Sequence, residues 1–547
     1  SGCEHFWPHK MYNLTQTEYC ELPATADVSK PTWVAGDIEK HFAREPHQDF
    51  FHKTPVVDSQ RNAYMATNSS HIIIVRPDGN LRGYMDCGAV LANIALHDRY
   101  LYACNGAGFV IKVDIETLEA VWNVKYTDYT ATDSWNPCVC PKAGILITAG
   151  QHRSMIPGPV GGNMIVFGLS IEDGSMVWYK ACHWICYNLL PSVWEDQDRV
   201  VWSDNVGGMY CHHISKNELI WEVPQFENLG AFTTGHCSSC PNGYLYNAYN
   251  LRTPPDQMPP WNKGAGAGGV IRAVSMETGE TKWMKVFPFE CHVAPVTVRK
   301  PGSDDYVVVC AQGCQGGHIP PRDGSTLEDD SERWPSGDAW EASVGCFDAE
   351  TGDELWRFHC PVWRHYEARG TYMDDVFLPD CFGSPTATSN GHAYVIHWSG
   401  TIYCFDVATG KVLSESDVGS SSQSAPVVVP GTLLAQVAYN LIAYRDEELE
   451  LAWLETARAA GDRRADPRLW KPSKQEITQR DKDAITAALS VSPTASVFPK
   501  TVCEPPPLPN KLYCEETYNA RLERLVNKNK EKAEGTPAAK AKAEPAA

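Results

Sequence analysis

Short apolar runs recur along most of the chain, and polar or glycine-containing turns separate them. Runs such as residues 72–75 and 92–96 have the length of β-strands and are too short for buried helices. The runs come in groups, and no helical periodicity interrupts them before about residue 445. The pattern therefore predicts an all-β fold for most of the chain.

One short pattern recurs through these groups. A strand ends at a turn that usually contains Thr-Gly or Asp-Gly, and the strand that follows usually carries a tryptophan. Seven copies end at residues 84, 122, 178, 221, 283, 356 and 413. Glycine permits the positive φ that such turns need, and the tryptophan offers a large flat surface for packing between units. Four strands per repeat with no helix between them predict the blades of a β-propeller.

The blade count follows from the seven copies and a partial unit at residues 424–445. We predict eight blades, with seven as the alternative. A ring of blades is expected to complete its last sheet with a strand from the other terminus, and residues before Val56 are available for this role.

The propeller is expected to occupy residues 51–445, after an N-terminal extension at 1–50. A helical and proline-rich extension is predicted at 446–526, with helices at 447–460 and 473–490. Residues 527–547 contain chiefly Lys, Ala, Glu and Pro and are expected to be disordered.

Net charge excludes two classes of function. Asp and Glu outnumber Lys and Arg by 67 to 47, a formal charge of -20. A general nucleic-acid binder needs a basic face, and electrostatic docking to anionic membranes needs the same. No apolar stretch is long enough for a transmembrane helix. We therefore expect no nucleic-acid partner and no transmembrane segment.

Cysteine is unusually frequent, with 20 residues. An even, high count favours disulfides and an oxidising compartment, although buried reduced thiols are the alternative. The chain begins with Ser1 rather than Met, which is expected of a chain whose signal segment has been removed. We predict a secreted, lumenal or otherwise extracytoplasmic protein. The preferred disulfides are Cys3–Cys20, Cys237–Cys240 and Cys503–Cys514, and the glycosylation sequons are at Asn13 and Asn68.

Four long segments fall at junctions that share one rim of the predicted ring. Residues 151–162, 251–268 and 313–340 lie between second and third strands, and residues 357–382 connect two blades. Loops on a rigid scaffold often carry function, although such loops can also simply pack on one another. The candidate binding residues on this loop-rich face are aromatic, basic or polar. They are His183, Trp184, Trp261, Asn262, His292, His318, Trp334, Trp363, Arg364, His365, Tyr366 and Arg369.

Three carboxylates in the 357–382 segment are candidate ligands of a hard cation such as calcium. They are Glu367, Asp374 and Asp375. A solvated charged loop is the alternative. No Cys and His spacing typical of a zinc or haem site occurs in the sequence.

The repeat Ala-x-Asp-x-x-Thr-Gly-x-x-x-Trp resembles that of the quinoprotein alcohol dehydrogenase-like superfamily, which has pyrroloquinoline quinone (PQQ) repeats. The best copies are residues 273–283 and 345–356, and the resemblance covers about residues 50–445. It implies PQQ and calcium as cofactors. The family's enzymes place adjacent cysteines against the quinone, whereas this sequence contains no adjacent pair; Cys138 and Cys140 come nearest.

Two kinds of function are compatible with this sequence. The leading prediction is an extracytoplasmic scaffold that binds a protein or a small ligand through the loop-rich face, with the C-terminal extension as a second attachment. The first alternative is a PQQ- and calcium-dependent dehydrogenase of alcohols or sugars. A polysaccharide-binding protein is the second alternative, and no catalytic residue is assigned.

Overall fold

The computed structural model describes most of the chain from His5 to Asp466. The described residues are 5–17, 19–35, 53–67, 70–89, 91–128, 130, 135, 137–151, 163–182, 186, 190–204, 207–224, 231–232, 237–252, 266–287, 291, 293–300, 302–313, 342–361, 382–397, 399–419, 421–422, 424–437 and 440–466.

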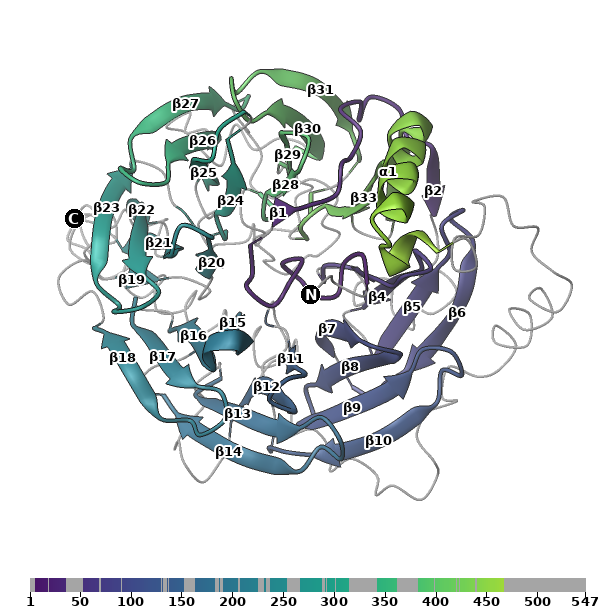
Figure 1. The fold of residues 1–547 in the computed structure, drawn as a ribbon, viewed down its shortest axis with the longest axis vertical. Helices are drawn as coiled ribbons and strands as arrows, with labels where there is room; N and C mark the ends of the chain where they lie inside the picture. Colours follow the sequence, from purple (N-terminus) through teal and green to yellow (C-terminus); the bar gives the residue numbers. More distant parts are fainter. Residues whose placement is uncertain are drawn as a thin grey trace, which may run out of the picture.

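Eight antiparallel sheets stand around a common axis as the blades of a propeller (Figure 1). Blade 1 contains β3 (Val56–Val57), β4 (Ala63–Ala66), β5 (His71–Val75) and β6 (Leu81–Asp86). Blade 2 contains β7 (Leu91–His97), β8 (Tyr100–Asn105), β9 (Phe109–Asp114) and β10 (Ala120–Lys125). Blade 3 contains β11 (Cys138–Cys140), β12 (Ile145–Gly150), β13 (Ile165–Ser170) and β14 (Met176–Ala181). Blade 4 contains β15 (Ser192–Trp194), β16 (Arg199–Ser203), β17 (Met209–His213) and β18 (Leu219–Val223).

The second half of the ring repeats this plan. Blade 5 contains β20 (Cys237–Ser239), β21 (Tyr244–Arg252), β22 (Gly266–Ser275) and β23 (Thr281–Phe287), with β19 (Ala231–Phe232) also paired to β21. Blade 6 contains β24 (Val296–Arg299), β25 (Tyr306–Gly313), β26 (Ala342–Asp348) and β27 (Glu354–His359). Blade 7 contains β28 (Thr386–Thr388), β29 (His392–Ile396), β30 (Thr401–Asp406) and β31 (Val412–Asp417). Blade 8 contains β32 (Val427–Val429), β33 (Thr432–Val437) and β34 (Asn440–Arg445).

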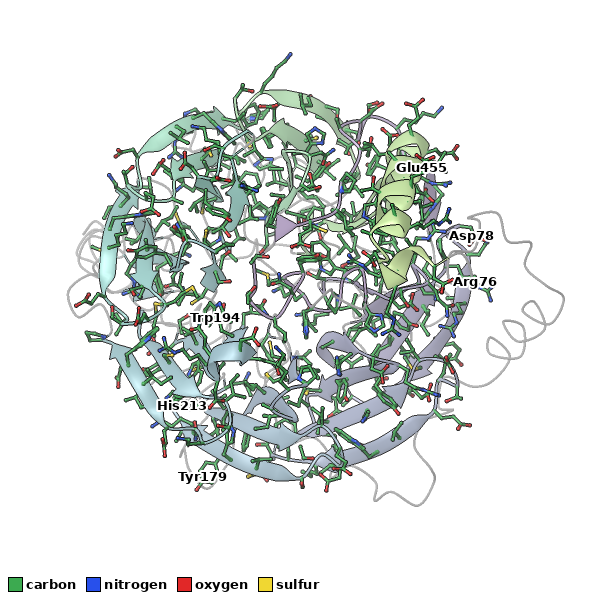
Figure 2. The ribbon with its side chains drawn as sticks, in the orientation of Figure 1. Arg76, Asp78, Tyr179, Trp194, His213 and Glu455 are labelled. Carbon is green, nitrogen blue, oxygen red and sulfur yellow. The ribbon has the colours of Figure 1, made fainter. Side chains whose placement is uncertain are left out.

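The first strand of each blade lies near the axis and the fourth lies at the circumference. The inner and middle strands are buried along most of their length, whereas the outer strands consist mainly of half-buried and exposed positions. Figure 2 shows this arrangement in neighbouring blades, where Trp194 of β15 lies toward the centre and Tyr179 of β14 lies at the outer edge. The predicted eight-bladed propeller is confirmed, and seven blades are excluded.

The ring closes with a strand from the N-terminal part of the chain. Strand β2 (Trp33–Ala35) pairs antiparallel with β34 and supplies the fourth strand of blade 8. This pairing confirms the predicted closure, and it covers the edge that β34 would otherwise expose. Residues expected to form an extension thus contribute to the propeller itself.

A tryptophan on the outer strand joins most blades to the next one. Trp122, Trp178, Trp221, Trp283 and Trp356 each pair with the third strand next to a register shift, so they occupy equivalent places, as predicted. Four of these indoles donate Nε1–H to a carbonyl in the following blade, at 2.8–3.1 Å. The acceptors are Ile214, Met276, Ala349 and Val407.

Of the five tryptophans at this position, all except Trp178 also pack against the glycine in the turn between the third and fourth strands of the following blade. A β-carbon added at Gly352 would be 2.7 Å from Cδ2 of Trp283. The φ of Gly352 is +73°, so glycine satisfies two requirements there, the left-handed backbone and the close approach of the ring. Trp33 meets Gly79 of blade 1 in the same way and donates to Pro77 O at 3.1 Å. In Figure 2 this turn, marked by Arg76 and Asp78, lies beside β2.

The junction between blades 1 and 2 inverts this contact. The register places Gly83 where five other outer strands carry tryptophan, and Leu118 with φ +61° stands at the turn position of glycine. A β-carbon at Gly83 would be 3.5 Å from Cδ1 of Leu118. Arg82 donates to Ile115 O at 2.9 Å and so takes the carbonyl that an indole would bind.

A helix follows the last strand, as predicted. Helix α1 (Glu447–Ala459) begins at Asp446, whose side chain accepts hydrogen bonds from the amides of Glu448 and Leu449. The short 3₁₀ turn η4 (Arg463–Ala465) follows it, and the second predicted helix at 473–490 lies outside the described residues. Across the described chain, no helix has the length and apolarity that crossing a membrane requires.

The predicted Cys237–Cys240 disulfide is not formed, and no disulfide joins any two described cysteines. Residues three apart on an extended strand point to opposite faces of a sheet. Cys237 accordingly packs with Trp221 of blade 4, whereas Cys240 packs with Phe347 of blade 6. Burial raises the pKa of Cys237 to about 11 and that of Cys240 to about 12, which keeps both thiols protonated. Cys3, Cys503 and Cys514 lie outside the described residues.

We predict that Gly352→Ala destabilises the protein more than Gly302→Ala does. Both glycines have positive φ, but an added β-carbon at Gly302 meets nothing within 4 Å. The control should therefore cost only about 1–2 kcal/mol for the left-handed backbone. Gly352→Ala should cost about 1–3 kcal/mol more, because the methyl group displaces Trp283. Urea unfolding of the two variants measures the difference, and equal midpoints would contradict the proposed junction.

Candidate functional site

The axis of the ring is occupied by residues 5–17, 19 and 20, which we call the channel segment. It bonds to the inner strands of blades 1, 2 and 4 through the backbone of Trp7, Pro8 and Leu14, with N–O distances of 2.8–3.0 Å. Gln16 donates to Cys138 Sγ of blade 3 at 3.5 Å, and Ser238 of blade 5 donates to Thr17 O at 3.4 Å. In Figure 1 the segment lies in the middle of the ring.

The channel segment ends by pairing with blade 7, the sixth blade that it contacts. Strand β1 (Tyr19–Cys20) pairs in parallel with β28 of blade 7. Phe6, Trp7, Met11 and Gln16 are fully buried. The segment therefore fills the space between the inner strands as part of the core.

Polar side chains of the channel segment are buried with the apolar ones. His9 is 3% exposed, and its Nδ1 has no hydrogen-bond partner among the described residues. Burial lowers the pKa of His9 to about 3; His97 and His5 act in the same direction, and a hydrogen bond to the backbone of Pro137 opposes them. His9 is therefore neutral in the folded protein at ordinary pH.

Helix α1 and η4 cover the channel segment at one face of the ring. Trp453 of α1 meets Phe6 edge-on with ring centroids 5.8 Å apart, and Arg464 of η4 lies over the same Phe6 ring at 5.6 Å. Glu450 of α1 is 3% exposed and accepts from Arg61 at 3.0 Å and from Arg445 at 2.5 Å. A buried ion pair thus joins the helix to blades 1 and 8.

The opposite face is the predicted loop-rich face. Residues 151–162, 253–265 and 314–341 connect second to third strands, and the 357–382 segment connects β27 to β28, as the sequence predicts. The candidate residues of this face lie outside the described residues. They are His183, Trp184, Trp261, Asn262, His292, His318, Trp334, Trp363, Arg364, His365, Tyr366 and Arg369, together with Glu367, Asp374 and Asp375.

Two arginines on the described strands of blades 5 and 6 make several hydrogen bonds, the half-buried Arg357 and the buried Arg272. Arg357, the first residue of the 357–382 segment, donates to Ser343 Oγ at 2.7 Å, to Gln312 Oε1 and to Glu354 at 2.6 Å. Arg272 is 2% exposed and donates to Gly207 O at 3.0 Å and to Tyr249 Oη at 3.1 Å. Sequence reasoning missed Arg272, although an arginine inside the apolar run 270–274 is a detectable signal.

The residues present do not fit PQQ and calcium within the described chain. No described group of three His, Cys, Asp or Glu side chains could hold a metal ion. The channel segment fills the ring's axis, and Cys138 and Cys140 are separate buried thiols. Asn13 of the first sequon is half-buried in the channel segment, where its Nδ2 donates to Thr17 Oγ1 at 3.2 Å, and Asn68 lies outside the described residues. Glycosylation at both sequons stays a prediction.

Comparison with known proteins agrees with the fold. Residues 341–486 match the model of a family described as the outer membrane protein assembly factor BamB. No curated protein matches the chain in sequence. The chain resembles the quinohemoprotein alcohol dehydrogenase ADHIIG from Pseudomonas putida with a TM-score of 0.56 and 12% identity, over 82% of this chain and 80% of that one.

Two further solved structures give the same result. The quinohemoprotein alcohol dehydrogenase from Comamonas testosteroni has a TM-score of 0.54 and 11% identity over 80% of each chain. A europium-containing methanol dehydrogenase has a TM-score of 0.54 and 13% identity, over 85% of this chain and 93% of that one. The repeats and these matches show that the chain is a PQQ-repeat β-propeller.

We predict that Glu450→Ala loosens α1 from the ring. Removing one partner of a buried ion pair takes away the carboxylate that balances the buried guanidinium of Arg61, which costs about 3–5 kcal/mol. The control is Glu447→Ala, because Glu447 is exposed and pairs with Arg445 only at the surface, at 3.2 Å. That change should stay within about 0.5 kcal/mol. Urea unfolding and hydrogen exchange of α1 test this, and equal effects of the two changes would contradict it.

We predict that His9 makes the protein sensitive to acid. The folded-state pKa of His9 is lowered to about 3, whereas the unfolded value is about 6.5. The stability that neutral His9 contributes is complete above about pH 6.5 and is lost as pH falls toward 3. Between about pH 7.5 and pH 5 the wild type should lose about 2 kcal/mol more than His9→Gln. Urea unfolding at both pH values measures this, and equal losses would refute it.

Proposed function

We propose that this propeller is a scaffold that binds a protein partner through its loop-rich face and that it does not act as a dehydrogenase. The observation that carries this proposal is the channel segment. It bonds to the inner strands of six blades and is buried among them. The core of the ring is thereby completed by the chain itself, which leaves the rim as the surface available for recognition.

The composition of the rim supports a protein partner. The 357–382 segment contains Trp363, Tyr366 and Arg369, and aromatic and arginine side chains contribute most of the binding energy of protein interfaces. Its first residue, Arg357, is held by Ser343, Gln312 and Glu354, so the segment starts from a rigid position. The matching family model is described as an assembly factor, a role that consists of binding other proteins.

We also propose an extracytoplasmic location. The support comes from the description of the matching family, which refers to the outer membrane. The cysteines no longer support it, because no described pair forms a disulfide and all described cysteines except Cys182 are buried.

The scaffold and dehydrogenase proposals predict opposite results on cofactor loading. We expect that the full chain, incubated with PQQ and calcium chloride and then desalted, retains neither quinone absorbance nor dye-linked activity toward ethanol or glucose. A quinone retained in stoichiometric amount, together with such activity, would overturn the proposal. Heat-denatured protein treated identically controls for nonspecific adsorption.

The location of the binding surface is tested with two matched variants. The proteins that crosslink to the full chain are compared with those that crosslink to two variants. One variant carries both Trp363→Ala and Arg369→Ala, and the other is truncated after Trp470. We expect the double substitution to lose the partner and the truncation to keep it, with unchanged melting temperatures. Binding that survives the double substitution and disappears on truncation would place the functional surface in the C-terminal extension.

A further inference from the structure

A pocket of about 200 Å³ lies between blades 1 and 2, on the face that α1 crosses. Its wall comes from the β3–β4 turn with Asp58, the β7–β8 turn with Asp98 and Arg99, and the β9–β10 turn with Ile115 and Glu116. Arg82, His5 and Arg463 complete it. Turns of two blades, the channel segment and η4 therefore meet at this pocket.

The pocket lies at a junction whose outer strand lacks the inter-blade tryptophan. Gly83 replaces the indole, and Arg82 reaches across to the carbonyl of Ile115. A guanidinium group thus lines a site that faces an indole at other junctions. The exchange places a charged hydrogen-bond donor where the repeat otherwise has an apolar ring.

Arg82 is held rigidly and still has donors to offer. Its Nη1 donates to Tyr64 Oη at 3.0 Å and its Nη2 donates to Ile115 O at 2.9 Å. A guanidinium carries five N–H groups, and these two bonds fix its plane. A carboxylate matches the parallel N–H groups of a guanidinium in geometry and in charge.

The carboxylates of the wall differ in how many hydrogen bonds and ion pairs they already make within the protein. Asp58 accepts four hydrogen bonds within its own turn, at 2.8–2.9 Å, from Gln60 N, Asn62 N, Asn62 Nδ2 and Tyr64 Oη. Glu116 is 66% exposed and meets Arg99 only at 3.5 Å, since Arg99 is also bound to Asp114. Asp98 is exposed on the blade 2 side of the pocket. A cationic group bound here would therefore meet Asp98 and Glu116.

His5 fixes the spacing between the two sides. Its Nε2 lies 2.6 Å from Asp98 O, and its Nδ1 accepts from Ser59 N at 3.2 Å. The imidazole uses both nitrogens and ties the turn of blade 1 to that of blade 2. The turn that carries Asp58 and the turn that carries Asp98 are thus held together by a bonded side chain.

We propose that this pocket binds a small free amino acid as a zwitterion. Its carboxylate lies on Arg82, and its ammonium group lies between Asp98 and Glu116. The volume of about 200 Å³ suits an amino acid with a short side chain, and Ile115 provides an apolar contact for that side chain.

Calorimetric titration of the full chain with L-valine, L-valinamide and N-acetyl-L-valine tests the proposal. The second compound keeps only the positive charge of valine and the third keeps only the negative charge. We expect L-valine to bind with a Kd of about 1 mM or tighter, and both analogues to bind at least about tenfold more weakly. Absence of valine binding, or equal binding of all three compounds, would overturn the proposal.

Asp98→Asn tests the site itself. Asparagine has the same size and tolerates the φ of +52° at this position, so the melting temperature should not change. We expect this variant to bind L-valine at least about tenfold more weakly, whereas the control Asp304→Asn, at a residue that is 91% exposed on blade 6, binds as the wild type does. Glu116→Gln is the second variant if Asp98→Asn fails to fold. Wild-type affinity in the folded variant would refute the site.

Discussion

The packing of an indole on the glycine of the next blade's turn is the contact on which the ring depends. Each four-stranded sheet has one inner and one outer edge, and its faces are apolar, so a single blade cannot bury its own surface. The indole of Trp283, lying on Gly352 and bonded to Ala349 O, both fills the space between two sheets and fixes their separation. A side chain on the glycine would push the blades apart. Repetition of this contact therefore determines the angle between blades and, with it, the number that closes the ring.

The N-terminal chain completes the same design at two places. Strand β2 brings Trp33 to Gly79, so the last junction uses the contact found elsewhere in the ring. The channel segment then bonds to the inner strands of six blades and buries Phe6 and Trp7. The ring is thus closed at its circumference and filled at its axis by residues 5–35. Helix α1 and the long connections lie at opposite faces of this filled ring.

One feature of the site was visible in the sequence, and the rest was not. The positions of the long segments between strands identify the loop-rich face, because strand order alone decides at which rim a connection lies. The residues predicted there, such as Trp363 and Arg369, stay predictions. The channel segment could not be foreseen, because 5–20 has no strand periodicity and its partners are distributed over the whole chain. The disulfide at Cys237 and Cys240 was predicted wrongly, because sequence proximity does not reveal which face of a sheet a side chain occupies.

The sequence by itself determined the strands, the turns, the repeated tryptophan and hence the eight blades and the helix after residue 446. These features are local, since a turn glycine and an alternating strand depend on residues only a few positions apart. Only the tertiary structure decided which residues fill the axis of the ring and that Cys237 and Cys240 lie on opposite faces of a sheet. It also decided that, at the junction between blades 1 and 2, Gly83 takes the place of the large side chain and Leu118 takes the place of the turn glycine. Those outcomes depend on contacts between residues tens to hundreds of positions apart. They are determined by packing between blades, and no local sequence pattern records that packing.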